Sequence, residues 1–91
     1  MNNQKIAETI YNVIHADWKT RKEWLKEGKK SWKICKNYSI ERSEDCLCWY
    51  VYRQSGEFGE YLYYKVVPDS WHVSKRDFTE MLKVQPWNPA F

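Results

Sequence analysis

Apolar side chains recur at intervals of three and four residues through the first third of the chain. The set comprises Ile6, Ile10, Val13, Ile14, Trp18 and Leu25, with Arg21 at the same spacing. Because an α-helix completes a turn in about 3.6 residues, this spacing places the set on one face. The pattern predicts helical structure over residues 3–28, with the rings of Trp18 and Trp24 in contact with the core.

Capping residues mark the ends of this helical region. Asn2 or Asn3 can cap its start, and Gly28 can supply the left-handed residue that ends it. Asp17 is a possible second N-cap. The pattern therefore fits either one long helix or two helices with a break near His15–Asp17, and the sequence leaves both open.

The residues that follow alternate between apolar and polar. The apolar positions of residues 31–41 are Trp32, Ile34, Tyr38 and Ile40. They share one parity, and Lys36 is the exception to it. A period of two residues predicts a strand with one face buried.

A hairpin signal comes next. The runs Cys46–Gln54 and Glu60–Val67 are rich in aromatic and β-branched residues, and the short loop Ser55–Gly59 between them contains glycine. Bulky side chains suit a pleated, packed surface, and glycine allows the positive φ of a tight turn. With a polar turn at residues 42–45, residues 31–67 are predicted to form a three-stranded antiparallel meander.

The register of the hairpin decides which side chains share a face. In one possible register, the residue numbers of each cross-strand pair add up to an odd number, as for Trp49 opposite Tyr64. This register segregates the aliphatic side chains on one face, and we predict it for that reason. The apolar face is then Leu47, Trp49, Val51, Leu62, Tyr64 and Val66. The opposite, tyrosine-rich face is Tyr50, Tyr52, Tyr61 and Tyr63, with Arg53 and Lys65 alongside. The predicted core comprises Trp49, Val51, Leu62, Val66, Ile10, Ile14, Phe78 and Leu82. Whether a helix covers the tyrosine-rich face stays open.

The last part of the chain predicts a short helix and an aromatic tail. Pro68 ends the sheet because it cannot donate to the ladder. Ser74 and Asp77 fit a capping box, which predicts a helix over residues 75–83. Residues 84–91 are irregular, but the aromatic side chains of the tail predict that it packs back on the body. The chain is thus expected to be a single α+β domain, residues 1–91, of order α-β-β-β-α.

Composition agrees with a small soluble domain. The chain has 91 residues, 43% of them hydrophobic and 30% charged, and its 16 aromatic rings offset the small core of so short a chain. The start lacks the apolar core of a signal peptide, and no apolar run approaches the ~20 residues that span a bilayer. We therefore expect a cytoplasmic protein whose three cysteines are reduced thiols.

Positive charge is concentrated in one block. Residues 19–36 hold eight Lys or Arg and two Glu, a net charge of +6, whereas the whole chain carries +3. Such a block is typical of a solvated helix face or of a surface for an acidic partner or nucleic acid. The candidate binding residues from this block are Lys22, Lys26, Lys29, Lys30 and Lys33. Lys75 and Arg76 join them because cations at a helix N-terminus favour phosphate.

Metal and catalytic chemistry have little support in the residue pattern. Cys35, Cys46, Cys48 and His72 are the residue types that bind zinc, but they lack a C-x-x-C spacing, and the aromatic neighbours of Cys48 favour small core side chains. A cysteine enzyme needs a base beside the thiol, and His15 and His72 are interpreted as surface or packed residues. We predict neither a metal site, nor a cofactor, nor an enzymatic activity.

These observations predict a small binding protein that docks an aromatic and basic surface on a larger macromolecule. A protein partner is expected ahead of nucleic acid, with no membrane and no small-molecule substrate. Proteins of this size and composition are common among phage and mobile-element accessory proteins, which suggests an inhibitor or modulator of host machinery. The alternative is a nucleic-acid-binding module that uses the Lys19–Lys36 block.

Overall fold

The computed structural model describes residues 2–84 and 86–90. Over these residues the chain forms a compact α+β fold with three helices and a five-stranded antiparallel sheet. The elements are α1 (Asn3–Ile14), α2 (Trp18–Glu27), β1 (Ser31–Cys35), β2 (Tyr38–Arg42), β3 (Cys48–Ser55), β4 (Tyr61–Pro68), α3 (Lys75–Val84) and β5 (Asn88–Pro89). None of the helices in this described part is long and apolar enough to cross a membrane.

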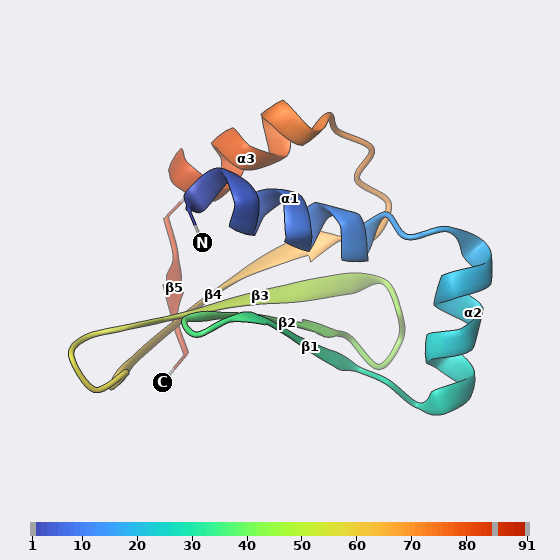
Figure 1. Ribbon diagram of the computed structural model, residues 1–91, viewed down its shortest axis with the longest axis horizontal. Helices are drawn as coiled ribbons and strands as arrows, with labels where there is room; N and C mark the ends of the chain where they lie inside the picture. The colour runs from blue at the N-terminus through green and yellow to red at the C-terminus, as the bar shows by residue number, and fades with distance from the viewer. Residues whose placement is uncertain (1, 85, 91) are drawn as a thin grey trace.

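The helices are not distributed evenly around the sheet. The strands follow one another in chain order, and α1 and α3 lie side by side over one face (Figure 1). α2 lies beyond the end of the sheet, next to the start of β1. The molecule therefore has one helical layer and one sheet layer, and α2 projects from the junction between them.

The N-terminal region is two helices, which resolves the alternative that the sequence left open. Asn2 caps α1 by accepting a hydrogen bond from the Lys5 N–H at 2.8 Å. Asp17 caps α2 by accepting from the Thr20 N–H at 2.8 Å, so the chain can turn between the helices. Gly28 ends α2 with φ of 73°, the left-handed conformation that its lack of a Cβ permits.

The sheet has more strands than the predicted three. Residues 31–41 do not form one strand, because the chain reverses at Lys36–Asn37 and β1 pairs with β2 as a hairpin. Lys36, the exception to the alternation, marks this turn, and asparagine is a favoured turn residue. β5 adds a fifth strand from the tail through the pairs Tyr63↔Pro89 and Tyr64↔Asn88. The predicted α-β-β-β-α order is wrong in these details.

The predicted register of the β3–β4 hairpin is also wrong. Trp49 lies opposite Val67, and Tyr52 lies opposite Tyr64, so the residue numbers of each pair have an even sum. Both Gly56 and Gly59 have positive φ in the loop, and this turn joins the strands with Ser55 opposite Tyr61. The turn geometry fixes the register, and it overrides the segregation of aliphatic residues.

The hydrophobic core lies between the sheet and the two helices that cover it. Its buried members are Ile6, Ile10, Ile14, Trp32, Ile40, Trp49, Val51, Val67 and Phe78. The prediction is confirmed for Trp49, Val51, Ile10, Ile14 and Phe78, and Leu82 packs against the cluster while partly exposed. It is wrong for Leu62, which is half-buried, and for Val66, which is 46% exposed, because the register turns both away from the helices.

The tail packs back on the body through Trp87. The Trp87 ring lies 4.6 Å from the Arg53 guanidinium carbon and 5.1 Å from the Lys65 ammonium nitrogen. Lys65 is only 5% exposed and donates to the Met81 carbonyl at 3.2 Å. Its burial, and then the charge of Arg53, lower the pKa of its ammonium group. The predicted packing of the tail is confirmed for Trp87, whereas Phe91 lies outside the described residues.

α2 is held to the body by few contacts. No residue of α2 is buried, and Trp18 is 71% exposed, so its predicted contact with the core is wrong. Trp24 meets the ring of Trp32 edge-on, with 5.0 Å between the ring centroids. Arg21 forms an ion pair of 2.7 Å with Asp69, in the chain segment that follows β4. These two contacts fix the orientation of α2.

Candidate functional site

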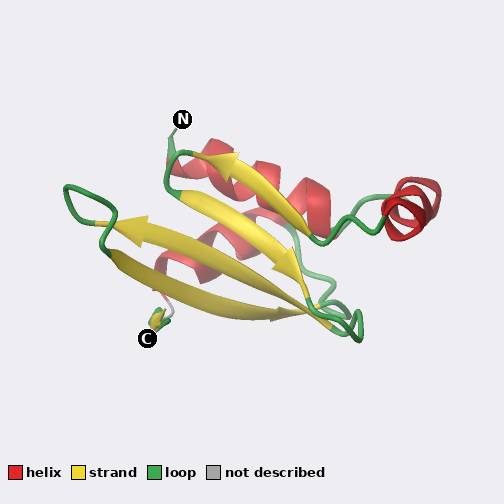
Figure 2. Cartoon of the chain, turned by 90° about the horizontal axis from the view of Figure 1, so that it is seen from below, coloured by secondary structure: helices red, strands yellow, loops and turns green. Residues whose placement is uncertain are grey.

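Among the described residues, no helix lies over one face of the sheet (Figure 2). Figure 2 views the molecule from this side, with α1 and α3 behind the strands. We call it the open face; its side chains are Lys33, Ser39, Glu41, Cys48, Tyr50, Tyr52, Gln54, Leu62, Tyr64 and Val66. They alternate along each strand with the buried residues of the core, as a half-buried antiparallel sheet requires.

Three tyrosines gather at the centre of the open face. The ring centroids of Tyr50, Tyr52 and Tyr64 lie 6.4 Å apart in each of the three pairs, with tilted or edge-on rings. Tyr52 and Tyr64 are direct cross-strand partners, and Tyr50 lies opposite Val66. We call this triangle the tyrosine cluster. The rings are half-buried against one another, so each ring restricts the rotamers of its neighbours and the cluster presents an ordered surface.

Two carboxylates lie near the tyrosine cluster. A hydrogen bond with the Cys48 side chain raises the pKa of the Tyr50 hydroxyl, and the carboxylate of Asp45 adds to the effect. Desolvation raises the pKa of the Tyr52 hydroxyl, and the carboxylate of Glu41 adds to the effect. Both hydroxyls therefore stay protonated at neutral pH and can donate hydrogen bonds to a partner.

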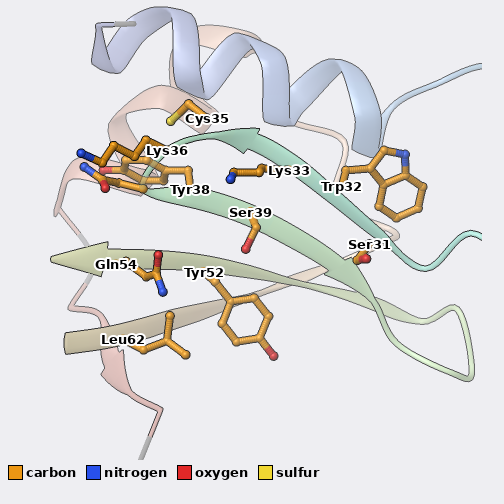
Figure 3. A pocket seen from close by; sticks show the side chains of 11 residues that line it. Ser31, Trp32, Lys33, Cys35, Lys36, Tyr38, Ser39, Tyr52, Gln54 and Leu62 are labelled. Atoms are coloured by element: carbon orange, nitrogen blue, oxygen red, sulfur yellow. The ribbon is translucent and has the colours of Figure 1, made fainter. Parts of the chain in front are cut away.

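A groove crosses the open face beside the tyrosine cluster. It has a volume of about 570 Å³ and opens to solvent (Figure 3). Its lining is Ser31, Trp32, Lys33, Cys35, Lys36, Asn37, Tyr38, Ser39, Tyr52, Gln54 and Leu62. Within the described part of the chain, this lining includes two lysines and no Asp or Glu, in contrast to the surroundings of the cluster. We call it the β1 groove.

The structure separates the four tyrosines that the sequence assigned to one face. Tyr50 and Tyr52 lie on the open face, but Tyr61 and Tyr63 point to the helical side of the sheet. Tyr63 stacks beside Arg53, with 5.7 Å between the ring centroid and the guanidinium carbon. Tyr64 takes their place on the open face. The sequence reasoning missed it because the wrong register turned it inward.

The basic block does not form one surface. Lys22 and Lys26 lie on α2, whereas Lys33 lies on the open face. Lys30 pairs with Glu44 at 3.2 Å, and the Lys29 ammonium lies 5.6 Å from the Trp32 ring centroid. The charge that the sequence concentrates is therefore divided among a helix, a loop and a strand.

The other predicted cations lie in the helical layer. Lys75 and Arg76 begin α3, on the far side of the sheet from the open face. Lys75 lies with its ammonium nitrogen 5.8 Å from the Tyr11 ring centroid. The predicted combination of the Lys19–Lys36 block with the start of α3 therefore spans separate faces of the molecule.

The candidate zinc ligands are not brought together. Among the described residues, no group of three His, Cys, Asp or Glu side chains is placed to hold a metal ion. Cys48 lies beside Tyr50 on the open face, and Cys35 ends β1 at the groove. His72 lies next to His15 instead, with 6.4 Å between the ring centroids. Burial, followed by the charge of His72, lowers the pKa of His15.

Comparison with protein-family models, with curated proteins and with solved structures finds no match to this chain.

Proposed function

We propose that this chain is a non-enzymatic binding protein that docks the open face of its sheet on a protein partner. The observation that carries the proposal is the tyrosine cluster, with the exposed side chain of Val66 and the half-buried Leu62 beside it. Tyrosine is enriched where protein interfaces bind most strongly, because its ring is large and rigid while its hydroxyl can hydrogen-bond.

The charge distribution favours a protein over nucleic acid as the partner. Glu41 and Asp45 lie close enough to the tyrosine cluster to affect its hydroxyl groups, and carboxylates repel phosphates. Lys22, Lys26 and Lys75 lie on other surfaces, so they do not supply phosphate contacts around the cluster. Stacked bases would need cations beside the rings, and of the three tyrosines of the cluster only Tyr52 lines the groove that holds Lys33 and Lys36. An inhibitor or modulator that acts on a cytoplasmic host protein fits a small chain with one docking face.

The experiment compares two exposed positions on opposite sides of the sheet, Val66 at 46% and Tyr61 at 55% exposure. Val66→Glu places a charge on the open face, and Tyr61→Glu places the same charge on the helical side, where Tyr61 is 55% exposed. Tagged wild-type protein and both variants are used to capture partners from the native host, with nuclease treatment. The affinity for the recovered, purified protein is then measured.

We expect wild type and Tyr61→Glu to bind the purified protein alike, and Val66→Glu to bind at least about 30-fold more weakly, as at an interface hot spot. Equal binding by both variants refutes docking through the open face. Capture that nuclease abolishes, with binding to a labelled duplex that weakens steeply with salt, supports the nucleic-acid alternative instead.

A further inference from the structure

We propose that the β1 groove binds an acidic, extended peptide segment of the partner. This inference deepens the proposed function and rests on it, because the groove belongs to the same open face. It adds the chemistry of the bound segment, which the tyrosine cluster alone does not define. The argument uses the charge, the free polar groups and the width of the groove.

The charge of the groove selects an anion. Lys33 and Lys36 are exposed in its lining, and within the described part of the chain neither forms an ion pair. Lys30, by contrast, is already paired with Glu44. Among the described residues, the lining contains no Asp or Glu, so a carboxylate that enters the groove meets two cations and no acidic side chain of this set.

Polar side chains in the groove have unused hydrogen-bonding capacity. Within the described residues, the side chains of Asn37, Ser39 and Gln54 make no hydrogen bond to the rest of the protein. Figure 3 shows Ser39 and Gln54 beside Tyr52 in the groove. Amide and hydroxyl groups can donate to and accept from a peptide backbone, while Tyr52 and Leu62 offer it apolar contacts.

The width of the groove favours a peptide over a small anion. Its lining residues come from β1, β2, β3 and β4 and from the turn between β1 and β2. Neighbouring strands lie about 4.8 Å apart, so the groove spans roughly 14 Å, the length of about four extended residues. A single carboxylate or phosphate ion fills only a small part of this space.

A second copy of this chain is a poor occupant. β1 is the outermost strand of the sheet, and it carries Lys33 in its centre and an irregular register between Lys33 and Cys35. Central lysines and bulges are the features that keep sheet edges from pairing with one another. Two copies would also bring Lys33 and Lys36 toward the same residues of the other chain.

The test uses an octapeptide with blocked termini, in which every second residue is glutamate and the residues between are serine or leucine. A matched peptide has glutamine in place of each glutamate. Binding is followed by ¹⁵N chemical-shift titration of wild type at low salt. Two double variants remove the same charge: Lys33→Gln with Lys36→Gln in the groove, and Lys22→Gln with Lys26→Gln on α2. Sodium phosphate at matched ionic strength tests a small anion.

We expect the glutamate peptide to shift the amides of Lys33, Ser39 and Gln54, and the glutamine peptide to bind more weakly. The groove double variant should weaken binding about 2- to 30-fold, as expected for two exposed charge pairs, and the α2 double variant should not. Equal binding of both peptides, equal loss in both double variants, or the same shifts with phosphate each overturns the inference. If Val66→Glu abolishes capture of the protein partner while the groove double variant captures it normally, the groove inference fails and the proposed function stands.

Discussion

Asp69 connects α2 to the sheet, and its removal is the sharpest test of the fold. One oxygen of its carboxylate accepts from Arg21 at 2.7 Å and from the indole N–H of Trp49 at 2.8 Å. Trp49 is 1% exposed, whereas the Arg21 and Asp69 side chains are 29% and 26% exposed. The two interactions should therefore contribute different amounts to stability.

The magnitude follows from this difference in burial. A hydrogen bond from a buried donor to a charged acceptor contributes about 1.5–3 kcal/mol, and removing the acceptor leaves the indole N–H unsatisfied. The ion pair is partly exposed to water, which limits it to about 0.5–1 kcal/mol. We expect Asp69→Ala to destabilise the protein by about 2–4 kcal/mol. Arg21→Ala should cost only about 0.5–1 kcal/mol, and almost nothing when Asp69 is already alanine.

Urea denaturation of Asp69→Ala, Arg21→Ala and the double variant measures the free energy of unfolding of each, and hence the coupling between the two residues. Asp69→Asn is the matched control. The amide oxygen of asparagine still accepts from the indole, so most of the stability should remain. An Asp69→Ala cost below about 0.5 kcal/mol would refute the reasoning.

The pH dependence of the same variants gives an independent check. Desolvation raises the pKa of Asp69, but the hydrogen bonds from Trp49 and Arg21 outweigh it, so the net pKa lies below 3.8. The carboxylate therefore contributes stability above pH 3.8 and loses that contribution as the pH falls through its lower folded value. The stability difference between wild type and Asp69→Asn should narrow over this acid range.

Four further outcomes are expected. Val51→Ala should cost about 1–3 kcal/mol because it leaves a cavity in the core, whereas Leu62→Ala on the open face should cost below about 1 kcal/mol; equal urea midpoints would contradict the assigned faces. Trp87→Ala should cost about 2 kcal/mol because it exposes two packed cations, and Trp18→Ala less than about 0.5 kcal/mol. Burial and a neighbouring imidazole lower the pKa of His15 below 6.5, so thermal stability should fall as the pH drops from 6.5 through the lower pKa of the folded state, and His15→Gln should flatten that slope. Elemental analysis should find no stoichiometric zinc, and a chelator should leave the melting temperature unchanged; one zinc per chain would overturn this prediction.

Local signals in the sequence predicted the helices well. Asn2, Asp17, Gly28 and Ser74 all occupy the capping positions that their side chains or φ angles suit. The Ser74 hydroxyl accepts from the Asp77 N–H at 3.1 Å, as the capping box requires. Caps depend on residues within one turn of each other, so a single sequence contains the information.

The sheet could be predicted only in part, because its register depends on the turn and on contacts from distant residues. Periodicity showed correctly that Trp49 and Val51 share a face. It did not show that Lys65 faces the same side. A buried lysine is unexpected from the local pattern, because the groups that stabilise it, the Met81 carbonyl and the Trp87 ring, lie more than 15 residues further along the chain. The tyrosine cluster was therefore only partly predicted: Tyr50 and Tyr52 follow from one strand, and Tyr64 needs the register of the other.

One sheet face stays uncovered because the helices with buried apolar side chains pack on the other face. α1 buries Ile6, Ile10 and Ile14 against the sheet, and α3 buries Phe78 in the same layer. α2, the remaining helix of the described part, has no buried residue with which to cover a second face. Tyrosine suits the uncovered face because its rings pack on one another while its hydroxyls meet water. A partner that covers the cluster would bury apolar area that the helices of the described part leave exposed. This is why the open face, and not the scattered lysines, is the surface on which the proposed binding function rests.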